Sequence, residues 1–161
     1  MRQARSADLL YRPAELLDVP ALARLRAQEW GTTEYWITRL TRYLSGEANP
    51  QKALPQRAVF VGQAGVDIAG FIAGHLTTRF DCQGELEWIN VDVSWRRSGV
   101  GSGLLSTMAA WFAEHRADRI CVNVEPDNTA AMQFYARHGA VPLNRHWMVW
   151  PDLPLARRRI F

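Results

Sequence analysis

Three glycines and two arginines between residues 96 and 103 form the part of the sequence best suited to bind a polyanion. The segment reads Arg96-Arg97-Ser98-Gly99-Val100-Gly101-Ser102-Gly103 and lies between an alternating apolar stretch and a helical pattern. Glycine permits positive φ and leaves backbone N–H groups uncovered, and the positive end of the following helix points to the same place. With two guanidinium groups beside it, the turn favours a ligand that carries a pyrophosphate or a similar polyanion.

Two glutamates precede this turn on a stretch, residues 85–93, that has the pattern of a β-strand. Its period of two predicts one face made of Glu85, Glu87, Ile89, Val91 and Val93. A carboxylate beside apolar neighbours binds its proton more tightly, which suits a general base. Glu85 and Glu87 are therefore both candidate bases, and an exposed edge carboxylate remains the alternative for each.

Strands and helices around these groups follow from hydrophobic periodicity and from helix caps. Strands are expected at residues 9–12, 58–62, 68–76, 85–93, 119–124, 141–144 and 146–150. Helices are expected at residues 19–30 and 33–45, after Gly101, and from Asn128 to Gly139, with a loop at 46–56. Pro151 and Pro154 are expected to end regular structure, which leaves Arg157-Arg158-Arg159 in a solvated tail.

The order of these elements predicts an α/β fold with a mixed, mainly antiparallel sheet and helices on both faces. Three strands before the glycine turn can pair through short connections. The strand, helix and strand around the turn form a crossover, which makes that pair of strands parallel. The length of 161 residues suits one domain, residues 1–161.

Composition narrows the class of protein. With 48% apolar and 22% charged residues, the chain is an ordinary globular protein, and a net charge of +3 is weak support for nucleic-acid binding. No apolar run approaches the length of a membrane span or of a secretory leader, so we expect a cytoplasmic protein without a membrane partner. Cys82 and Cys121 are then reduced thiols, separated in sequence and in unlike contexts.

Two motifs in the right order resemble the GNAT superfamily of N-acetyltransferases. The first, from Val91 to Leu104, is similar to the acyl-CoA pyrophosphate loop, in which Arg or Gln stands three residues before Gly-x-Gly. The second is Asn128-x-x-Ala131-x-x-Phe134-Tyr135-x-x-x-Gly139, which looks like a later helix of that family. The sequence departs from the family at Val93 and Arg97, where many members have Pro and Gly.

The resemblance implies the acyl-CoA N-acyltransferase (GNAT) fold and transfer of an acetyl group from acetyl-CoA to an amine within a ternary complex. It makes Tyr135 the general acid for the CoA thiolate and assigns Glu85, or Glu87 on the same face, as the base. A strand N–H near Val91 to Val93 would bind the thioester oxygen. The implied cofactor-binding residues are Val91, Val93, Arg96, Arg97, Ser98, Gly99, Val100, Gly101, Ser102, Gly103, Asn128, Ala131 and Tyr135.

The acceptor implied is a small-molecule or peptide amine, with the segment from Thr32 to Pro50 on the acceptor side. A homodimer stays open, and neither a metal nor a nucleic acid is implied. The four histidines, His75, His115, His138 and His146, lack metal-like spacing.

Other interpretations of the same residues stay open. A dinucleotide fingerprint needs a glycine one residue later than Gly103, and the Gly-Lys-Ser/Thr of a P-loop is absent. Cys121 lies in a buried-type strand, and Cys82 lies in a loop without a nearby His. Inert thiols are therefore a better interpretation of both residues than a catalytic nucleophile. Without the motif, Tyr135 would be a core aromatic residue. A non-catalytic, CoA-binding regulatory module keeps the same fold without the chemistry.

Overall fold

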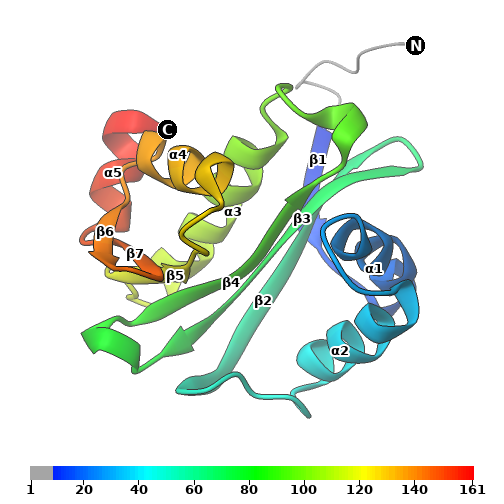
Figure 1. Ribbon diagram of the computed structural model, residues 1–161, viewed down its shortest axis with the longest axis horizontal. Coiled ribbons are helices and arrows are strands. Elements are labelled where there is room, and N and C mark those ends of the chain that lie inside the picture. Colours follow the sequence, from blue (N-terminus) through cyan, green and yellow to red (C-terminus); the bar gives the residue numbers. More distant parts are fainter. Residues whose placement is uncertain (1–8) are drawn as a thin grey trace.

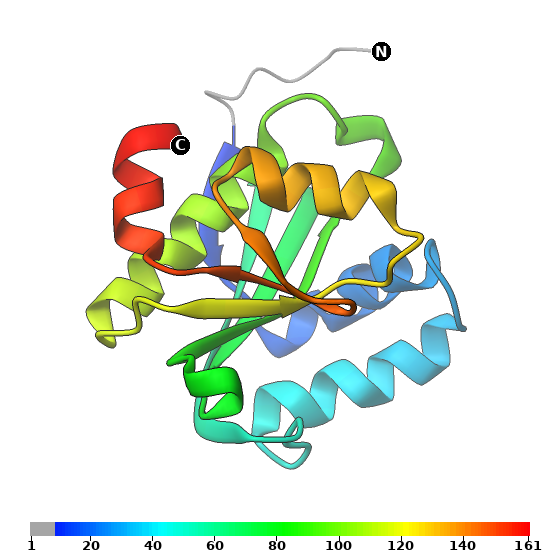
Figure 2. The ribbon, with the colours of Figure 1, turned by 60° about the vertical axis from the view of Figure 1, so that its left-hand side comes forward.

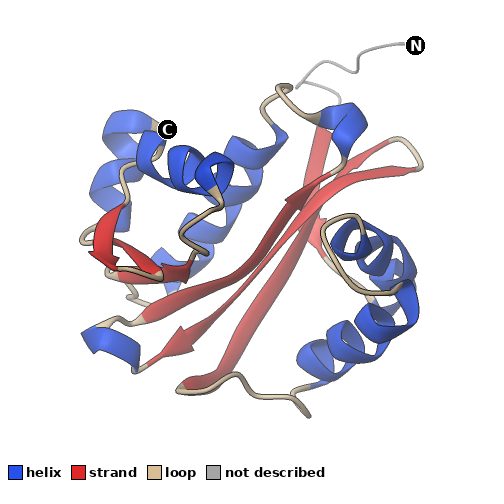
Figure 3. Ribbon diagram, viewed as in Figure 1, coloured by secondary structure: helices blue, strands red, loops and turns tan. Residues whose placement is uncertain are grey.

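The computed structural model describes residues 9–161, which form a seven-stranded sheet between two layers of helices (Figures 1 and 3). The spatial order of the strands is β1-β2-β3-β4-β5-β7-β6. The strands are β1 Leu9–Pro13, β2 Ala53–Ala64, β3 Asp67–Thr77, β4 Gly84–Val91, β5 Ile120–Asn123, β6 Val141–Asn144 and β7 Trp147–Trp150. Only β4 and β5 pair in parallel, so the predicted mixed, mainly antiparallel sheet is confirmed.

Helices cover both faces of the sheet, as predicted. The helices are α1 Val19–Ala27, α2 Thr33–Ser45, α3 Val100–Glu114, α4 Thr129–Arg137 and α5 Leu153–Ile160. Short 3-10 turns are η2 Leu16–Asp18, η3 Arg79–Asp81 and η4 Val93–Trp95. In Figure 1, α1 and α2 lie on one face and α3, α4 and α5 on the other. In the described part of the chain, no helix is both long and apolar enough to span a bilayer.

A separate apolar core lies on each face of the sheet. On the face of α1 and α2, Leu22, Trp36 and Leu40 pack against Phe71 of β3. The opposite core is larger and joins α3, α4 and α5 to the sheet. It is built from Ile72, Leu86, Leu104, Leu105, Met108, Phe112, Ile120, Tyr135, Trp150 and Leu153, among others. The sheet is thus held rigidly from both sides, which fixes the positions of side chains along β4.

The C-terminal segment is a helix, so the predicted end of regular structure at Pro151 and Pro154 is wrong. Asp152 caps α5 through a hydrogen bond that its side chain accepts from Leu155 N at 3.1 Å. Pro154 lies in the first turn, where a missing N–H costs nothing. Leu153 is buried and Arg157 donates to Ser106 of α3, so the expected tail packs beside that helix (Figure 2).

Strand β2 begins earlier than predicted, at Ala53 within the expected loop 46–56. Strand β1 pairs with β2 only from Phe60 to Ala64, which leaves the first half of β2 at an edge of the sheet. Pro55 is tolerated here because the register of β2 with β3 is interrupted between Ala53 and Arg57, so no regular ladder bond is lost.

Strands β4 and β5 separate soon after they meet. They pair only over Gly84, Glu85 and Leu86, opposite Ile120, Cys121 and Val122. From that point to Val91, β4 has β3 as its strand neighbour. One edge of β4 is therefore open where the glycine turn begins.

Candidate active site

A β-bulge in β4 changes which face of the sheet the residues after Leu86 occupy. Ala73 of β3 pairs with Trp88, whereas the next residue, Gly74, pairs with Leu86, so Glu87 has no partner in the register. Such an extra residue re-aims the side chains on the bulged strand. The bulge could not be read from the strand's alternating sequence.

The predicted common face of the glutamates and the valines is wrong for this reason. Leu86, Ile89 and Val91 all pack on the side of α3. Trp88 instead belongs to the core of α1 and α2, and the two glutamates face the same side as Trp88. The candidate bases therefore point towards α2.

A pocket of about 520 Å³ lies between α2 and β4 and contains Glu87. Its lining residues are Tyr35, Thr38, Arg39, Arg42, Tyr43, Ala48, Asn49, Pro50, Glu87 and Trp88. Nearly all of them come from the segment Thr32 to Pro50, the segment expected on the acceptor side. The volume falls within the usual range for small-ligand sites.

Glu87 is a largely buried carboxylate, which makes it a candidate for the base. Its side chain is 13% exposed, at the wall of the pocket. Burial raises the pKa of this carboxyl, while His75, Arg39 and Arg26 oppose the rise and Glu85 adds to it. A general base is most effective when its pKa lies near the working pH, so a shift of the pKa of Glu87 upwards is in the favourable direction.

Glu85 has a different environment, on the same face but with a cationic partner. Arg79 Nε donates to Glu85 Oε1 at 3.0 Å, and the Glu85 side chain is only 6% exposed. The pocket that contains Glu87 is not lined by Glu85. Glu85 is thus better placed to compensate charge than to receive a proton from a bound molecule.

His75 joins the two glutamates, and spacing in the sequence did not identify it. His75 Nδ1 is 2.9 Å from the Tyr43 hydroxyl. Its Nε2 is 3.8 Å from Glu85 Oε1 and has no hydrogen-bond partner in the described part of the chain. One atom from each of His75, Glu85 and Glu87 lies within 4.8 Å of the others. The register of β3 with β4 pairs His75 with Glu85 and so brings His75 to both glutamates.

A second polar network beside β4 also escaped prediction. Arg26 Nη1 donates to Asn90 Oδ1 at 3.0 Å and to Glu29 Oε2 at 3.1 Å, and Asn90 Nδ2 donates to Glu29 Oε1 at 2.8 Å. The guanidinium group of Arg26 lies 4.4 Å from the ring centre of Trp36. The available signal was a polar residue in each element, Arg26 in the expected helix and Asn90 in the expected strand. The sequence did not indicate that these two side chains would contact each other.

The N-terminus of α3 presents free N–H groups at the predicted turn. Gly99 is the N-cap and has no side chain to satisfy them, and the first helical bond runs from Gly103 N to Gly99 O at 3.0 Å. The N–H groups of Val100, Gly101 and Ser102 precede that bond and have no partner inside the helix. Three uncovered donors at the positive end of a 15-residue helix are a geometry that suits an anion, so the turn stays a candidate anion site.

The three glycines of the turn are required for different reasons. Gly99 has φ of +86° and open space around its missing Cβ. A Cβ on Gly101 would lie 3.0 Å from the Phe134 ring of α4, and one on Gly103 would overlap the Tyr11 hydroxyl. Only Gly99 is needed for backbone conformation, whereas Gly101 and Gly103 permit close packing around the start of α3.

Arg97 adopts the left-handed conformation, with φ of +63°, which explains why glycine is usual at this position in the resembled family. We expect Arg97→Gly to raise the stability of the unliganded protein by about 0.5 to 1 kcal/mol, because relief of the strain exceeds the added chain entropy. The melting temperature should rise by about 1 to 4 °C in differential scanning calorimetry. Arg96→Gly is the matched control because Arg96 has φ of −64°. Equal losses of stability in both variants would contradict the strain.

Helix α4 lies directly against this turn and joins the two motifs. Ser102 Oγ is 2.9 Å from His138 Nε2, and His138 Nδ1 is 2.8 Å from the carbonyl oxygen of Phe134. Because a carbonyl only accepts, Nδ1 carries a proton and donates it to Phe134 O, while Nε2 forms the hydrogen bond with the Ser102 hydroxyl. Asn128, proposed for the cofactor, caps α4 by accepting from Ala131 N at 3.1 Å.

Tyr135 is buried on α4, in the core on the side of α3. Its ring contacts Trp150, with ring centres 5.6 Å apart in an edge-to-face arrangement. Burial raises the pKa of the Tyr135 phenol well above its ordinary value, with Glu29 adding to the rise and Arg26 opposing it.

The Val91 N–H points to the open edge of β4. Asp92 N donates to Ala69 O of β3 at 2.8 Å, and successive N–H groups alternate between the two edges of a strand. The N–H of Val91 therefore faces the side of β5, where no strand of the described residues pairs with β4 beyond Leu86. Val93 was predicted on the strand, but it begins η4 and is exposed, because β4 ends at Val91.

The two cysteines, distant in sequence, share one small apolar cluster with Val149. Both are buried free thiols, and burial raises the pKa of each. A high pKa keeps the thiol protonated and unreactive. This agrees with the expectation of inert thiols and argues against a cysteine nucleophile.

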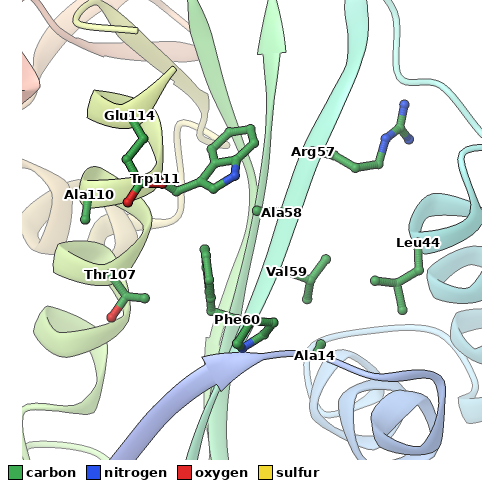
Figure 4. Close-up of a pocket in the computed structure, with 11 residues that line it drawn as sticks. Ala14, Leu44, Arg57, Ala58, Val59, Phe60, Thr107, Ala110, Trp111 and Glu114 are labelled. Atoms are coloured by element: carbon green, nitrogen blue, oxygen red, sulfur yellow. The ribbon is translucent and has the colours of Figure 1, made fainter. Parts of the chain in front are cut away.

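A second hollow of about 530 Å³ lies along the free edge of β2 and contains none of the predicted site residues (Figure 4). Trp111, Thr107 and Glu114 of α3 line one side, and Leu44 of α2 lies on the other side of β2. The two candidate bases Glu85 and Glu87, the N-terminus of α3 and Tyr135 do not line it. The candidate active site therefore comprises the pocket of Glu87 and the open edge of β4.

Comparison with known proteins identifies the same architecture. The model of the acetyltransferase (GNAT) family matches residues 20–140. No curated protein sequence matches the chain. An acetyltransferase from Thermus thermophilus is 20% identical, with a TM-score of 0.71 over 94% of this chain and 99% of that one.

Two further solved structures share the fold at similar distance. Ard1 from Thermoplasma volcanium is 21% identical, with a TM-score of 0.68 over 88% of this chain and 96% of that one. The PaiA N-acetyltransferase from Thermoplasma acidophilum, solved with coenzyme A, is 14% identical with a TM-score of 0.64 over 89% and 98%. At these identities the likeness establishes the fold, and the predicted fold class is confirmed.

Proposed function

Since the chain belongs to the acetyltransferase (GNAT) family, whose model matches residues 20–140, we propose that it transfers an acetyl group from acetyl-CoA directly to a primary amine. The pyrophosphate would be held by the free N–H groups at the start of α3, with Arg96 and Arg97 beside them. The fit rests on the uncapped helix and on Gly99, which leaves the approach to the donors open. Acetyl-CoA supplies the activated acetyl group when bound.

Glu87 is the base in this proposal. A primary amine has a pKa near 10 and is mostly protonated at pH 7, so it must lose a proton before or during attack. Glu87 lines the pocket with a raised pKa, whereas Glu85 is paired with Arg79. The carboxylate takes the proton from nitrogen as the new carbon–nitrogen bond forms. That Glu87 alone of the two lines a pocket is the observation that carries the proposal.

Val91 and Tyr135 complete the transfer. The N–H of Val91 at the open edge of β4 is available to donate to the thioester oxygen as negative charge develops there. The carbon–sulfur bond then breaks and sulfur leaves with the electron pair. Tyr135, kept protonated by its raised pKa, donates its phenolic proton to that sulfur. A serine, cysteine or histidine acyl intermediate is not needed.

Thiol release from acetyl-CoA in the presence of a panel of amines tests the proposal. Release should depend on an amine, and mass spectrometry should find the acetyl group on that amine. Thiol release without an amine product would indicate hydrolysis. The same assay decides against the alternative, a regulatory module that binds CoA and transfers nothing, if turnover occurs.

Binding itself should be visible as thermal stabilisation. At a hundred times its dissociation constant, acetyl-CoA should stabilise the protein by about 2.7 kcal/mol. For a chain of this size, the melting temperature should rise by about 5 to 11 °C. NAD is the control ligand and should give no shift. A shift with NAD and none with acetyl-CoA would favour the dinucleotide interpretation of the glycine turn.

A further inference from the structure

The pocket between α2 and β4 contains a guanidinium group, that of Arg39, which is not engaged in an ion pair within the described part of the chain. Arg39 lines this pocket and forms no ion pair with an acidic side chain among residues 9–161. Its Nη1 lies 3.1 Å from the Tyr35 hydroxyl, and its guanidinium carbon is 5.8 Å and 5.7 Å from the ring centres of Trp36 and Trp88. Aromatic groups thus orient Arg39, and within the described residues its guanidinium group acts on Glu87 only through its charge and has no direct acidic partner.

The remaining charges of the pocket reinforce this asymmetry. Arg42 also lines it, and its distance of 3.9 Å from Glu47 is long for an ion pair in an exposed position. Among residues 9–161, Glu87 is the only acidic residue that lines it. A molecule with several positive charges would meet two guanidinium groups on entry. A molecule with one amine and one anionic group would match both signs.

We infer that the acceptor is a small primary amine that carries a carboxylate, as a free amino acid does. Its amine would lie at Glu87 and its carboxylate at Arg39, because a guanidinium group binds a carboxylate through two parallel hydrogen bonds. The rings of Tyr35, Tyr43 and Trp88 would enclose the carbon skeleton. The volume of about 520 Å³ suits a compound of this size. This inference rests on the function proposed above, since it names the acceptor for the same transfer.

Matched acceptors separate recognition of the carboxylate from reactivity of the amine. Alanine, leucine, phenylalanine and glutamate are each compared with the α-carboxamide of the same amino acid, and spermidine serves as a polycation. The amide has the amine that loses its proton more easily, so amine ionisation alone would favour the amide. The inference predicts the opposite for at least one pair, with kcat/KM higher for the acid by about 10- to 100-fold.

Arg39→Gln should remove this preference. The ratio of kcat/KM for acid over amide is expected to fall towards one, mainly through KM of the acid. Loss of a positive charge also affects Glu87, but that effect is common to both acceptors and cancels in the ratio. Arg24→Gln is the matched control, since Arg24 is exposed on α1 and outside the pocket, and it should keep the ratio. Arg39→Lys should restore part of the preference.

The outcomes distinguish this inference from the proposed function. Transfer to the amides or to spermidine as efficient as transfer to the acids would overturn the carboxylate assignment and leave the acetyltransferase intact. An acid preference that Arg39→Gln leaves unchanged would also overturn it, as would peptides with acidic N-termini that react better than every free amino acid. Absence of thiol release with all acceptors would instead refute the proposed function, and the inference with it.

Discussion

Glu87→Gln is expected to lower kcat/KM for an accepted amine by about 10²- to 10⁴-fold at neutral pH, the usual contribution of general base catalysis. Glutamine keeps the size of the side chain and cannot take a proton. The deficit should become much smaller near pH 9 to 10, where the amine loses its own proton to water. The measurement is a pH profile of kcat/KM for wild type and variant with the same amine.

Glu85→Gln is the matched control for this prediction because Glu85 lies on the same strand and face but is bonded to Arg79. Its loss at neutral pH should be smaller, and it should not shrink at high pH, because it would come from disturbed charge compensation. Equal and pH-independent losses in the two variants would mean that neither carboxylate acts as the base.

The thermal stability of Glu87→Gln tests whether the pKa of Glu87 is raised in the folded protein. The folded protein raises the pKa of Glu87, so the folded state binds this proton more tightly than the unfolded state does. Protonated Glu87 therefore stabilises the folded state. This contribution is fully present below the pKa of the unfolded state and is lost as the pH rises through the raised pKa of the folded state. Glu87→Gln should melt at a higher temperature than wild type at neutral pH, and the difference should shrink on acidification. A less stable variant at neutral pH would contradict the raised pKa.

Tyr135→Phe is expected to lower kcat by about 100-fold, at the lower end of the usual range for general acid catalysis. A thiol with a pKa near 8.5 is already a fair leaving group. The raised pKa of Tyr135 also makes it a weak acid, although it secures the protonated form. Steady-state kinetics with one accepted amine measure this loss of kcat. The substitution should leave the affinity for acetyl-CoA nearly unchanged.

Phenylalanine keeps the ring of Tyr135 and its contact with Trp150, so packing should survive the substitution. Calorimetric titration with CoA separates the two roles that remain. Wild-type turnover in Tyr135→Phe would return the residue to the role of a core aromatic. Weakened CoA binding with a normal kcat would make it a contact of the cofactor only.

Local signals predicted the elements that depend on local chemistry. Helix α2 begins where the Thr32 side chain accepts from Tyr35 N and ends at Gly46, whose φ is +81°. The glycine turn before α3 was predictable for the same reason, since positive φ and uncovered N–H groups are properties of the residues themselves. Pro154 shows the limit of such signals, because proline can begin a helix as well as end one.

The positions of the site residues on the sheet depended on pairing between distant segments. A single bulge at Glu87 moved Ile89 and Val91 to the face opposite to the glutamates, and alternation in one strand carries no record of its partner's register. His75 reached the glutamates through the same register. Arg26 and Asn90, 64 residues apart, meet only after α1 packs on the sheet. The residues that could bear the chemistry were therefore predictable, and their arrangement was not.

Mass spectrometry of a single turnover tests direct transfer most immediately. Protein in excess over acetyl-CoA is mixed with an amino acid or with its amide, and the reaction is quenched at short times. The masses of the protein and of the amines are then measured. Direct transfer at Glu87 predicts that the acetyl group passes to the amine with no acetylated protein at any time, and that Glu87→Gln slows its appearance. An acetylated protein that forms and decays at the rate of product formation, or bound acetyl-CoA that never acetylates an amine, would contradict it.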